Sequence, residues 1–391
     1  MGGIPLWAHG PSAFSPGIAP LRVRLFSTET IERVQIDVER GRFAVLSQRH
    51  GRRKPDTVAV MATGQPGWTL SKESKKIRLR TRGTDRSLGR FEAVHWVPLE
   101  PGSRLRLQTK GSPKLHTGVV RFSQGSEGLT VVNEVDLEDY VAGVVQGEAG
   151  HVGTAQFLKA QAVLARTFAL RNLGKHGDLG YDLKDDVSSQ VYMGYPTGRF
   201  ADSILAAVRA TRDTVLLDEQ CRPALVVFHA NSGGQTVASE WVWGRPIPYL
   251  KARPDPFSEQ GPSARWVKRV PRDKMHRWLA DQFKTEPSNP DLIEAFARFE
   301  QPERKERFAW NGKSIPLPTL RHAFGLRSTW FNVRIDGDDY VLNGRGFGHG
   351  VGLAQDAAII MSEKGYNYKT ILYFYYGVLE LDAWRPTALL P

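Results

Sequence analysis

The sequence predicts an α+β protein in which a β-rich module precedes a mixed helical and β core. Short runs of alternating apolar residues fill the first third of the chain. Two helical patterns follow and meet at one carboxylate, Glu148. The chain has 391 residues, of which 41% are hydrophobic and 24% charged. This length and composition predict an ordinary globular protein of two or three domains.

The first third of the chain is expected to form antiparallel strands. Runs such as Leu21-Val23-Leu25 alternate with polar residues and are separated by Gly, Asp, Ser and Pro. The predicted divisions are a flexible lead at 1–20, a β-rich accessory module at 21–126, and a core at 127–391 with an inserted helical segment at about 263–327. Metal ligation is not expected from the module's widely spaced histidines, His50, His95 and His116.

The helical pattern before Glu148 begins at Asp136, whose side chain suits the N-cap position. Apolar residues at helical spacing then predict one buried stripe, and Gly147 and Gly150 mark the end of the helix and a turn. A carboxylate near the negative end of a helix has its ionised form disfavoured, so its pKa rises. That property suits a general acid, and Glu148 is the first catalytic candidate.

A second helical pattern, from Thr154 to Asn172, is apolar on almost every side, as expected for a helix at the centre of a core. It nevertheless carries Lys159, Gln161 and Arg166. Burying cations is costly unless they meet carboxylates or polar ligands, so these side chains could line a cavity that opens toward Glu148. The alternative, equally consistent with the spacing, is that Lys159 and Arg166 form structural ion pairs or extend outward.

The segment from His176 to Pro196 is polar and rich in glycine. Its hydroxyl and amide groups lack the spacing of metal ligands and suit a neutral polyol, although loops are polar by default. The candidate substrate contacts are Ser188, Gln190 and Tyr192. Beyond this segment the pattern predicts a helix at 199–212 and two short strands at 214–217 and 224–228.

The second of these strands leads into His229, Ser232 and Gly233, where consecutive glycines permit close approach of a ligand to the backbone. Ser232 and His229 could form a nucleophile and its base, but three positions apart in a loop is weak support for such a pair. A polar substrate wall is the preferred interpretation. Glu240 stands beside tryptophans, which either form a sugar platform or pack in a core.

The inserted segment is expected to contain two amphipathic helices, at 273–283 and 291–299, and an alternating hairpin follows at 330–342. A glycine-dense stretch then leads to His349 and Gln355. It has no Lys-Ser/Thr at the spacing of a phosphate loop, so nucleotide binding is not favoured. These two side chains would more readily line the cavity of Glu148, with a satisfied core histidine as the alternative.

The net charge of +12 and the pI near 9.7 favour an anionic partner, whether nucleic acid, lipid surface or acidic cell-wall polymer. Residues 72–110 carry 11 Lys or Arg against 4 Asp or Glu, so over half of the excess is local. No nucleic-acid-binding signature accompanies it, and a solvated face is the simpler interpretation. The single cysteine, Cys221, excludes an intrachain disulfide. Neither a membrane span nor a signal-peptide pattern is evident.

Ordered motifs across residues 130–381 together resemble the stage II sporulation protein D and amidase enhancer (LytB-like) family of bacterial cell-wall proteins. The matching motifs are Leu137-Glu138-Asp139-Tyr140, Gly143-Val144-Val145 leading to Glu148, Leu158-Lys159-Ala160-Gln161-Ala162-Val163 with Ala165-Arg166-Thr167, Gln190-Val191-Tyr192, His229 with Ser232-Gly233-Gly234, Trp243-Gly244, and Gly346-Phe347-Gly348-His349-Gly350-Val351-Gly352. The resemblance implies lytic transglycosylase activity, in which peptidoglycan glycan strands, peptide-stripped in the sporulation branch, are cleaved to 1,6-anhydro-muramic acid ends. It places the family's catalytic glutamate at Glu148.

The same resemblance implies glycan strands as the partner, a cell-wall amidase as a second partner in the enhancer branch, and a location outside the cytoplasm. Because members of this family are exported, the resemblance also favours the interpretation that this chain is trimmed at its N-terminus. One carboxyl group can protonate the leaving oxygen and then accept the proton of the sugar's own 6-hydroxyl, so no cofactor or metal is expected. Hydrolysis would need a second carboxylate, for which Glu240 is the reserve candidate.

Two departures from the family pattern concern this site. Ala149-Gly150 stands where members usually have Met-Pro, and the segment from Asp185 to Gln190 lacks the Cys and His that bind zinc in some members, so no structural zinc is expected. The rival functions are a non-catalytic peptidoglycan-binding enhancer of an amidase and, less favoured, a nucleic-acid binder using the basic module.

Overall fold

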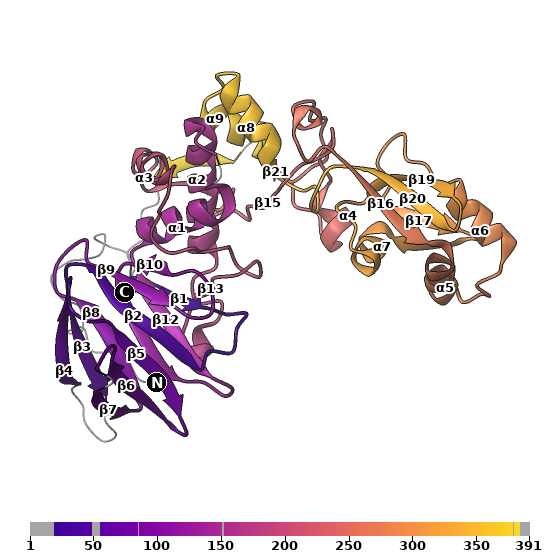
Figure 1. Cartoon of the computed structure of the whole chain (residues 1–391). Coiled ribbons are helices and arrows are strands. Elements are labelled where there is room, and N and C mark those ends of the chain that lie inside the picture. Colours follow the sequence, from indigo (N-terminus) through magenta and orange to yellow (C-terminus); the bar gives the residue numbers. More distant parts are fainter. Residues whose placement is uncertain (1–18, 49–54, 85, 151, 378, 384–391) are drawn as a thin grey trace. The chain divides into compact units, whose positions relative to one another are not determined.

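The computed structural model describes residues 19–48, 55–84, 86–150, 152–377 and 379–383. Helices and strands both build the chain, which confirms the predicted α+β class (Figure 1). The chain divides into two compact units, with boundaries after Leu225 and after Glu380, and each unit is described by itself. His50 and the predicted lead, apart from residues 19 and 20, lie outside the described residues. None of the described helices is long and apolar enough to span a membrane.

The β-rich part of the first unit consists of two sheets. Their strands are β1 (Leu21–Leu25), β2 (Arg33–Arg40), β3 (Arg42–Gln48), β4 (Asp56–Ala62), β5 (Trp68–Glu73), β6 (Lys76–Thr81), β7 (Ser87–Phe91), β8 (Ala93–Pro98), β9 (Arg104–Gln108), β10 (Lys114–His116), β11 (Val119–Gln124), β12 (Leu129–Val135) and β13 (Leu183–Lys184). The larger sheet has the order β13-β1-β12-β11-β8-β3-β4 and the smaller β10-β9-β2-β5-β6-β7. The strands of these two sheets pair antiparallel, except that β1 pairs with β13 in parallel.

The two sheets share one hydrophobic core. Because successive side chains of a strand point to opposite faces, the apolar residues of β1 are buried while the arginines between them are partly exposed. Trp68 of the smaller sheet meets Trp96 of the larger sheet edge to face, with ring centroids 6.2 Å apart. Phe122 packs on the other side of Trp96, at 5.1 Å. The antiparallel strands predicted from alternation are therefore present and packed face to face.

Three helices complete the first unit: α1 (Leu137–Ala149), α2 (Ala155–Arg171) and α3 (Ala201–Ala210). Strand β12 leads directly into α1, and Figure 1 shows the three helices grouped beside the sheets. α2 is buried on nearly every side because α1, α3 and strand β14 (Thr214–Leu217) all pack against it. β14 also pairs with β22 (Glu380–Ala383). These helices and β14 lie where the sequence predicts them.

The second unit begins with a two-residue strand rather than the longer one predicted at 224–228, since only Phe228 of that range is in β15. Its elements are β15 (Phe228–His229), α4 (Ser239–Trp243), β16 (Arg265–Pro271), α5 (Arg272–Phe283), α6 (Pro290–Ala297), β17 (Arg307–Trp310), β18 (Lys313–Pro316), α7 (Leu317–Phe324), β19 (Trp330–Asp336), β20 (Asp339–Arg345), β21 (Leu353–Ala354), α8 (Gln355–Glu363) and α9 (Tyr368–Tyr376). β15 pairs in parallel with β21, and β16, β20 and β19 form an antiparallel sheet.

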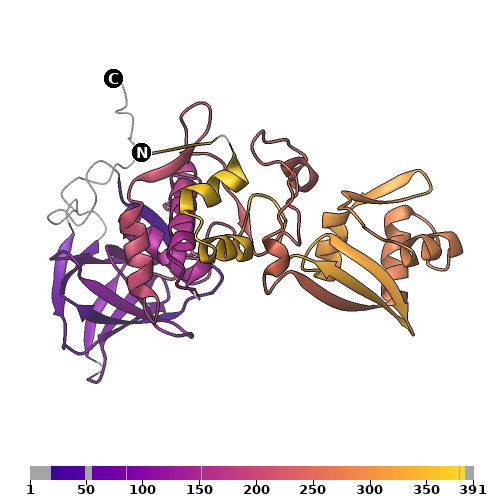
Figure 2. The same cartoon turned by 90° about the horizontal axis from the view of Figure 1, so that it is seen from above.

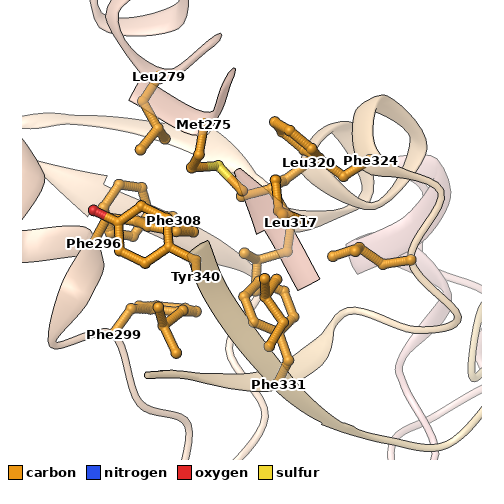
Figure 3. Close-up of a cluster of buried hydrophobic side chains, with 14 of the residues drawn as sticks. Met275, Leu279, Phe296, Phe299, Phe308, Leu317, Leu320, Phe324, Phe331 and Tyr340 are labelled. Carbon is orange, nitrogen blue, oxygen red and sulfur yellow. The ribbon is translucent and has the colours of Figure 1, made fainter. Parts of the chain in front are cut away.

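A separate hydrophobic cluster lies within the second unit. Figure 3 shows aromatic side chains from α6, β17, β19 and β20 gathered around Met275 and Leu317. The cluster runs from Trp266 to Leu342, so it includes the predicted hairpin as well as the segment predicted to be inserted at about 263–327. The strands β16 to β20 and helices α5 to α7 thus form a small lobe with a core of its own, whose orange strands are visible in Figure 2.

Candidate functional site

Glu148 occupies the last turn of α1. The helix begins as predicted, since the Asp136 side chain accepts a hydrogen bond of 2.8 Å from the Glu138 backbone N–H. Ala149 continues the helix beyond Glu148, and Gly150 is the C-cap. The Glu148 carboxyl is half-buried, and its Oε1 accepts a hydrogen bond of 2.9 Å from the Val191 backbone N–H. A carboxyl group at the end of one element is therefore oriented by the backbone of another.

The environment of Glu148 favours its neutral form. Burial raises the pKa of the Glu148 carboxyl, and the hydrogen bond from Val191 opposes part of the rise. The direction agrees with the sequence prediction, but desolvation is the cause that the structure supplies rather than the helix end. No neighbouring carboxylate among the described residues contributes to this shift. The rise therefore does not depend on a paired acid.

Two glycines of α1 allow residues 190–194, called here the Val191 segment, to lie against the helix. A Cβ at Gly147 would lie 2.2 Å from the Val191 carbonyl oxygen, and one at Gly143 would lie 2.4 Å from that of Gly194. Met193 N–H donates to the Gly143 carbonyl at 3.1 Å, which fixes the segment on this face. Gly147 lies in the last turn of the helix, two residues before its final residue Ala149. Its role is close approach of a second backbone, which brings Val191 within reach of Glu148.

Gln190 and Tyr192, the two neighbours of Val191 in the chain, are buried. The Tyr140 hydroxyl donates to Gln190 Oε1 at 3.3 Å, and the Tyr192 hydroxyl donates to Asn133 Oδ1 at 3.0 Å. The rings of Tyr140 and Tyr192 stack with centroids 5.2 Å apart. Tyr192 therefore belongs to the packing that supports the site. Gln190 is only 2% exposed, and its Nε2 has no hydrogen-bond partner among the described residues.

Arg166 of α2 forms the structural ion pair that the sequence left as an alternative. Its Nε and one terminal nitrogen donate to the two carboxylate oxygens of Glu138 at 2.8 and 2.6 Å. The other terminal nitrogen donates to the Thr214 carbonyl oxygen at 2.9 Å. The Arg166 side chain is completely buried, so all three nitrogens are used within the fold. Arg166 is for this reason not a substrate contact but a link between α1, α2 and β14.

Lys159 and Gln161, also on α2, differ from Arg166. Lys159 is half-buried, and the described part of the chain gives its ammonium group no ion-pair partner. Gln161 is fully buried, and neither amide atom of its side chain has a hydrogen-bond partner among the residues described. Both remain candidate contacts.

The segment carrying Ser188 is tied to the β-rich part of the unit. The Asp185 carboxylate accepts hydrogen bonds of 2.7 and 3.0 Å from the backbone N–H groups of Phe26 and Ser27. Ser188 is exposed, and its backbone N–H donates to Asp186 at 2.7 Å. Within the described ranges, no group of three or more His, Cys, Asp or Glu side chains is arranged to hold a metal ion.

The remaining predicted residues, His229, Ser232, Gly233, Glu240, His349 and Gln355, belong to the second unit. The Ser232 hydroxyl donates to Asp255 at 2.8 Å, and His229 Nδ1 lies 3.1 Å from the Val351 carbonyl oxygen. Ser232 and His229 therefore have other partners and do not form a nucleophile and base. Asp255 also accepts from Ser258 and Tyr375, so Ser232 is part of a buried structural network.

Gly233, beside Ser232, allows two segments of the chain to pack closely. Gly233 has a φ of +75°, and a Cβ there would lie 2.8 Å from the Arg345 carbonyl carbon and the Gly346 nitrogen. Asn231 and Phe347 exchange two backbone hydrogen bonds next to this contact, at 3.0 and 2.8 Å. A second segment of the same chain therefore occupies the space beside the Gly233 Cα, and the ligand contact of Gly233 stays a prediction.

His349 and His229 are neutral neighbours with ring centroids 5.4 Å apart. The Val351 N–H donates to His349 Nδ1 at 3.0 Å, so the ring proton is on Nε2, which donates to the Phe228 carbonyl oxygen at 3.0 Å. Burial lowers the pKa of His349 to about 4. This geometry matches the alternative of a satisfied core histidine. Trp243 lies against the other side of the His349 ring, at 5.5 Å.

Glu240 and Gln355 lie at the first turns of their helices. Glu240 is an exposed residue of α4, and its Oε2 accepts a hydrogen bond of 3.4 Å from the Ser239 hydroxyl. Gln355 is the half-buried first residue of α8. The candidate residues thus fall into two sets, one in each unit, and their convergence on a single cleft stays a prediction.

Sequence reasoning missed three residues that organise these sets: Tyr140, Asp255 and Arg304. Tyr140 follows the helical stripe of α1, which signals burial but not its partner Gln190. Arg304, in a stretch that reads as a charged linker, is buried under Trp330 and donates to the Ser232 carbonyl oxygen. Two hollows, of about 550 and 280 Å³, lie in the β-rich part of the first unit, and neither includes a predicted site residue.

Comparison with known proteins defines the class of the segment that holds Glu148. Residues 125–217 match the family model described as Stage II sporulation protein. This range contains α1, α2 and the Val191 segment. The chain therefore carries a domain of this family, and the predicted resemblance is confirmed.

Three individual relatives extend the similarity beyond that domain. The chain is 28% identical over 303 residues to Stage II sporulation protein D of Bacillus amyloliquefaciens, covering 73% of this chain and 87% of the relative. It is 29% identical over 294 residues to the protein of the same name from Bacillus subtilis strain 168, covering 70% and 83%. It is 26% identical over 294 residues to the amidase enhancer of Bacillus subtilis strain 168, covering 62% of this chain but 40% of that longer protein.

Proposed function

We propose that this protein acts on the bacterial cell wall as a lytic transglycosylase. It cleaves peptidoglycan glycan strands to 1,6-anhydro-muramic acid ends, outside the cytoplasm, with Glu148 as general acid and then base. The observation that carries the proposal is the half-buried Glu148 carboxyl, whose pKa is raised by burial and whose orientation is set by the Val191 N–H. The similarity to stage II sporulation proteins supports the cell-wall role.

In the proposed reaction, each oxygen of the Glu148 carboxyl has its own function. Because the Val191 N–H donates to Oε1, the proton of the neutral acid is on Oε2. Oε2 donates that proton to the glycosidic oxygen as the bond breaks. The resulting carboxylate accepts the proton of the sugar's 6-hydroxyl, which attacks the anomeric carbon and closes the anhydro ring. Proton and leaving group balance without added water, and one carboxyl group is sufficient.

Hydrolysis would instead require a second carboxylate at a defined distance from the first. Nearby carboxylates would raise the pKa of Glu148 through charge repulsion, yet burial is the cause found among the described residues. Intramolecular attack needs no second carboxylate, because the substrate supplies its own nucleophile. Lys159 and Gln161 are proposed to bind the substrate, because their polar groups have no ion pair or hydrogen bond within the described fold.

The test is a Glu148→Gln variant incubated with peptide-stripped glycan strands. The amide oxygen can still accept from Val191, so folding and glycan binding should persist. A general acid contributes about 10²- to 10⁴-fold, and the release of soluble fragments should fall by that factor. Glu219→Gln, at an exposed position of the turn after β14, is the matched control and should cleave normally. Unchanged cleavage by Glu148→Gln would remove this residue from the mechanism.

A second candidate is a non-catalytic glycan-binding protein that stimulates an amidase. The similarity to the amidase enhancer of Bacillus subtilis favours it. In that case Glu148→Gln should stimulate a cell-wall amidase as strongly as the wild-type chain, and neither protein should release glycan fragments. Stimulation that disappears together with cleavage would exclude this role.

A further inference from the structure

A row of arginines crosses the outer face of the smaller sheet. Arg33 of β2 is opposite Ser71 of β5, Ser71 is opposite Arg78 of β6, and Arg78 is opposite Arg90 of β7. Side chains directly opposite in neighbouring strands share one face, so the three guanidinium groups project to the same side of the sheet. In Figure 1 these strands lie next to one another at the surface of the β-rich part.

This arrangement is unfavourable for the isolated fold. Like charges directly opposite in a sheet destabilise it, as Arg78 and Arg90 are. Glu73 offsets the repulsion in part, with one carboxylate oxygen 3.0 Å from Arg78 and the other 2.7 Å from Arg90. Arg33 is exposed, and the described residues provide its guanidinium with neither an ion pair nor a hydrogen bond. The Glu73 carboxylate therefore neutralises only part of the positive charge of the three arginines.

The same face contains a hollow of about 280 Å³. The residues that line it are Arg33, Thr69, Ser71, Lys72, Glu73, Arg78 and Arg80. Four are cations, one is an anion, and two carry hydroxyls. Lys72 donates to the Glu127 carbonyl oxygen at 2.8 Å, and the described residues give its ammonium group no carboxylate partner. The hollow thus combines a net charge of +3 with hydroxyl and guanidinium donors.

We propose that this hollow binds a phosphate group of a phosphodiester-linked polyanion, such as a glycerol phosphate polymer. Guanidinium groups match phosphate oxygens in a planar, two-point geometry, and several of them can surround one tetrahedral group. A carboxylate offers only two oxygens and would leave donors unused. From β2 to β7 the row spans about 14 Å, three strand spacings of roughly 4.8 Å, which is longer than one phosphate and fits a chain of charges.

Three of the eleven cations of residues 72–110, Lys72, Arg78 and Arg80, line this hollow, and the proposed glycan reaction uses none of them. The site goes beyond the proposed cleavage of glycan strands, because it would hold the protein on a second, phosphate-bearing polymer. None of its residues belongs to the Glu148 site. A Glu148→Gln chain should consequently bind the polymer as tightly as wild type, which separates failure of this inference from failure of the proposed reaction.

The experiment measures binding of a fluorescent glycerol phosphate oligomer to the full chain at a fixed salt concentration. The Arg33→Gln/Arg78→Gln variant should bind at least about tenfold more weakly, because each lost charge-assisted hydrogen bond costs more than a neutral one. The matched control is Arg40→Gln/Arg106→Gln, which removes the same charge from exposed positions of the same sheet outside the hollow. It should bind within about twofold of wild type.

Folding of each variant is checked by thermal unfolding. Should Arg33→Gln/Arg78→Gln unfold early, the single Arg33→Gln variant replaces it, since Arg33 makes no described polar contact. Equal weakening by both double variants would mean a diffuse charge effect and overturn the inference. The inference would also be overturned if the protein bound polyglutamate or duplex DNA more tightly than the glycerol phosphate oligomer, at equal charge and salt.

Discussion

Replacing Gly147 by alanine tests how α1 and the Val191 segment are held together. Helix propensity alone favours alanine by about 1 kcal/mol. At this position, however, the new Cβ would lie 2.2 Å from the Val191 carbonyl oxygen and 3.0 Å from its carbonyl carbon. A backbone group cannot avoid the contact by changing rotamer, and overpacking of this kind costs about 1–3 kcal/mol. The cost of the clash should exceed the gain in helix propensity, with a net loss of stability of up to about 2 kcal/mol.

The same substitution should also reduce activity. If the Val191 segment moves away from α1, its N–H no longer donates to Glu148, and the carboxyl loses its fixed orientation. Urea unfolding and glycan cleavage are measured on Gly147→Ala and on a control, Gly177→Ala, where a Cβ meets nothing within 4 Å. The control should stay within about 0.5 kcal/mol of wild type. A Gly147→Ala protein that is more stable than wild type and cleaves normally would refute the proposed packing.

Two further predictions concern buried charge. Arg166→Met should destabilise the protein by about 3–5 kcal/mol, because Glu138, with 13% of its side chain exposed, loses its partner. Adding Glu138→Gln should restore part of that stability. Equal urea midpoints for the single and double variants would contradict this prediction. The pKa of Glu148 is higher in the folded protein than in the unfolded chain. At pH values between these two pKa values the folded state binds more protons than the unfolded state, so stability falls as the pH rises through this range. Wild type should therefore lose stability relative to Glu148→Gln with rising pH in the weakly acidic range, whereas parallel curves would show that Glu148 has an ordinary pKa.

The elements near the catalytic candidate were predictable because their signals are local. The cap at Asp136, the apolar stripe of α1 and the apolar surface of α2 are all contained in short stretches, and both helices occur where these patterns place them. The strands β16 to β18 and helix α7 were not predicted. Their burial depends on the cluster that assembles residues from Trp266 to Leu342, and such contacts are not visible in a short window.

Sequence patterns single out Glu148 as a candidate, but they do not reveal which partners surround the candidate residues. Helical spacing placed Arg166 on a buried face, yet the choice between a cavity and an ion pair depended on Glu138, 28 positions earlier in the chain. The glycines were recognised as special, but the sequence could not show which segment approaches them. Gly147 receives the Val191 segment, and Gly233 receives residues 345–346, so both serve chain packing.

The most direct test of the account is the mass of the new sugar ends released from peptide-stripped glycan strands by the wild-type protein. Intramolecular attack by the 6-hydroxyl predicts anhydro ends, one water lighter than reducing ends, and Glu148→Gln should release about 10²- to 10⁴-fold fewer of them. Reducing ends carrying the added water would contradict the account. They would require a second carboxylate in the mechanism, with Glu240 as the first residue to replace.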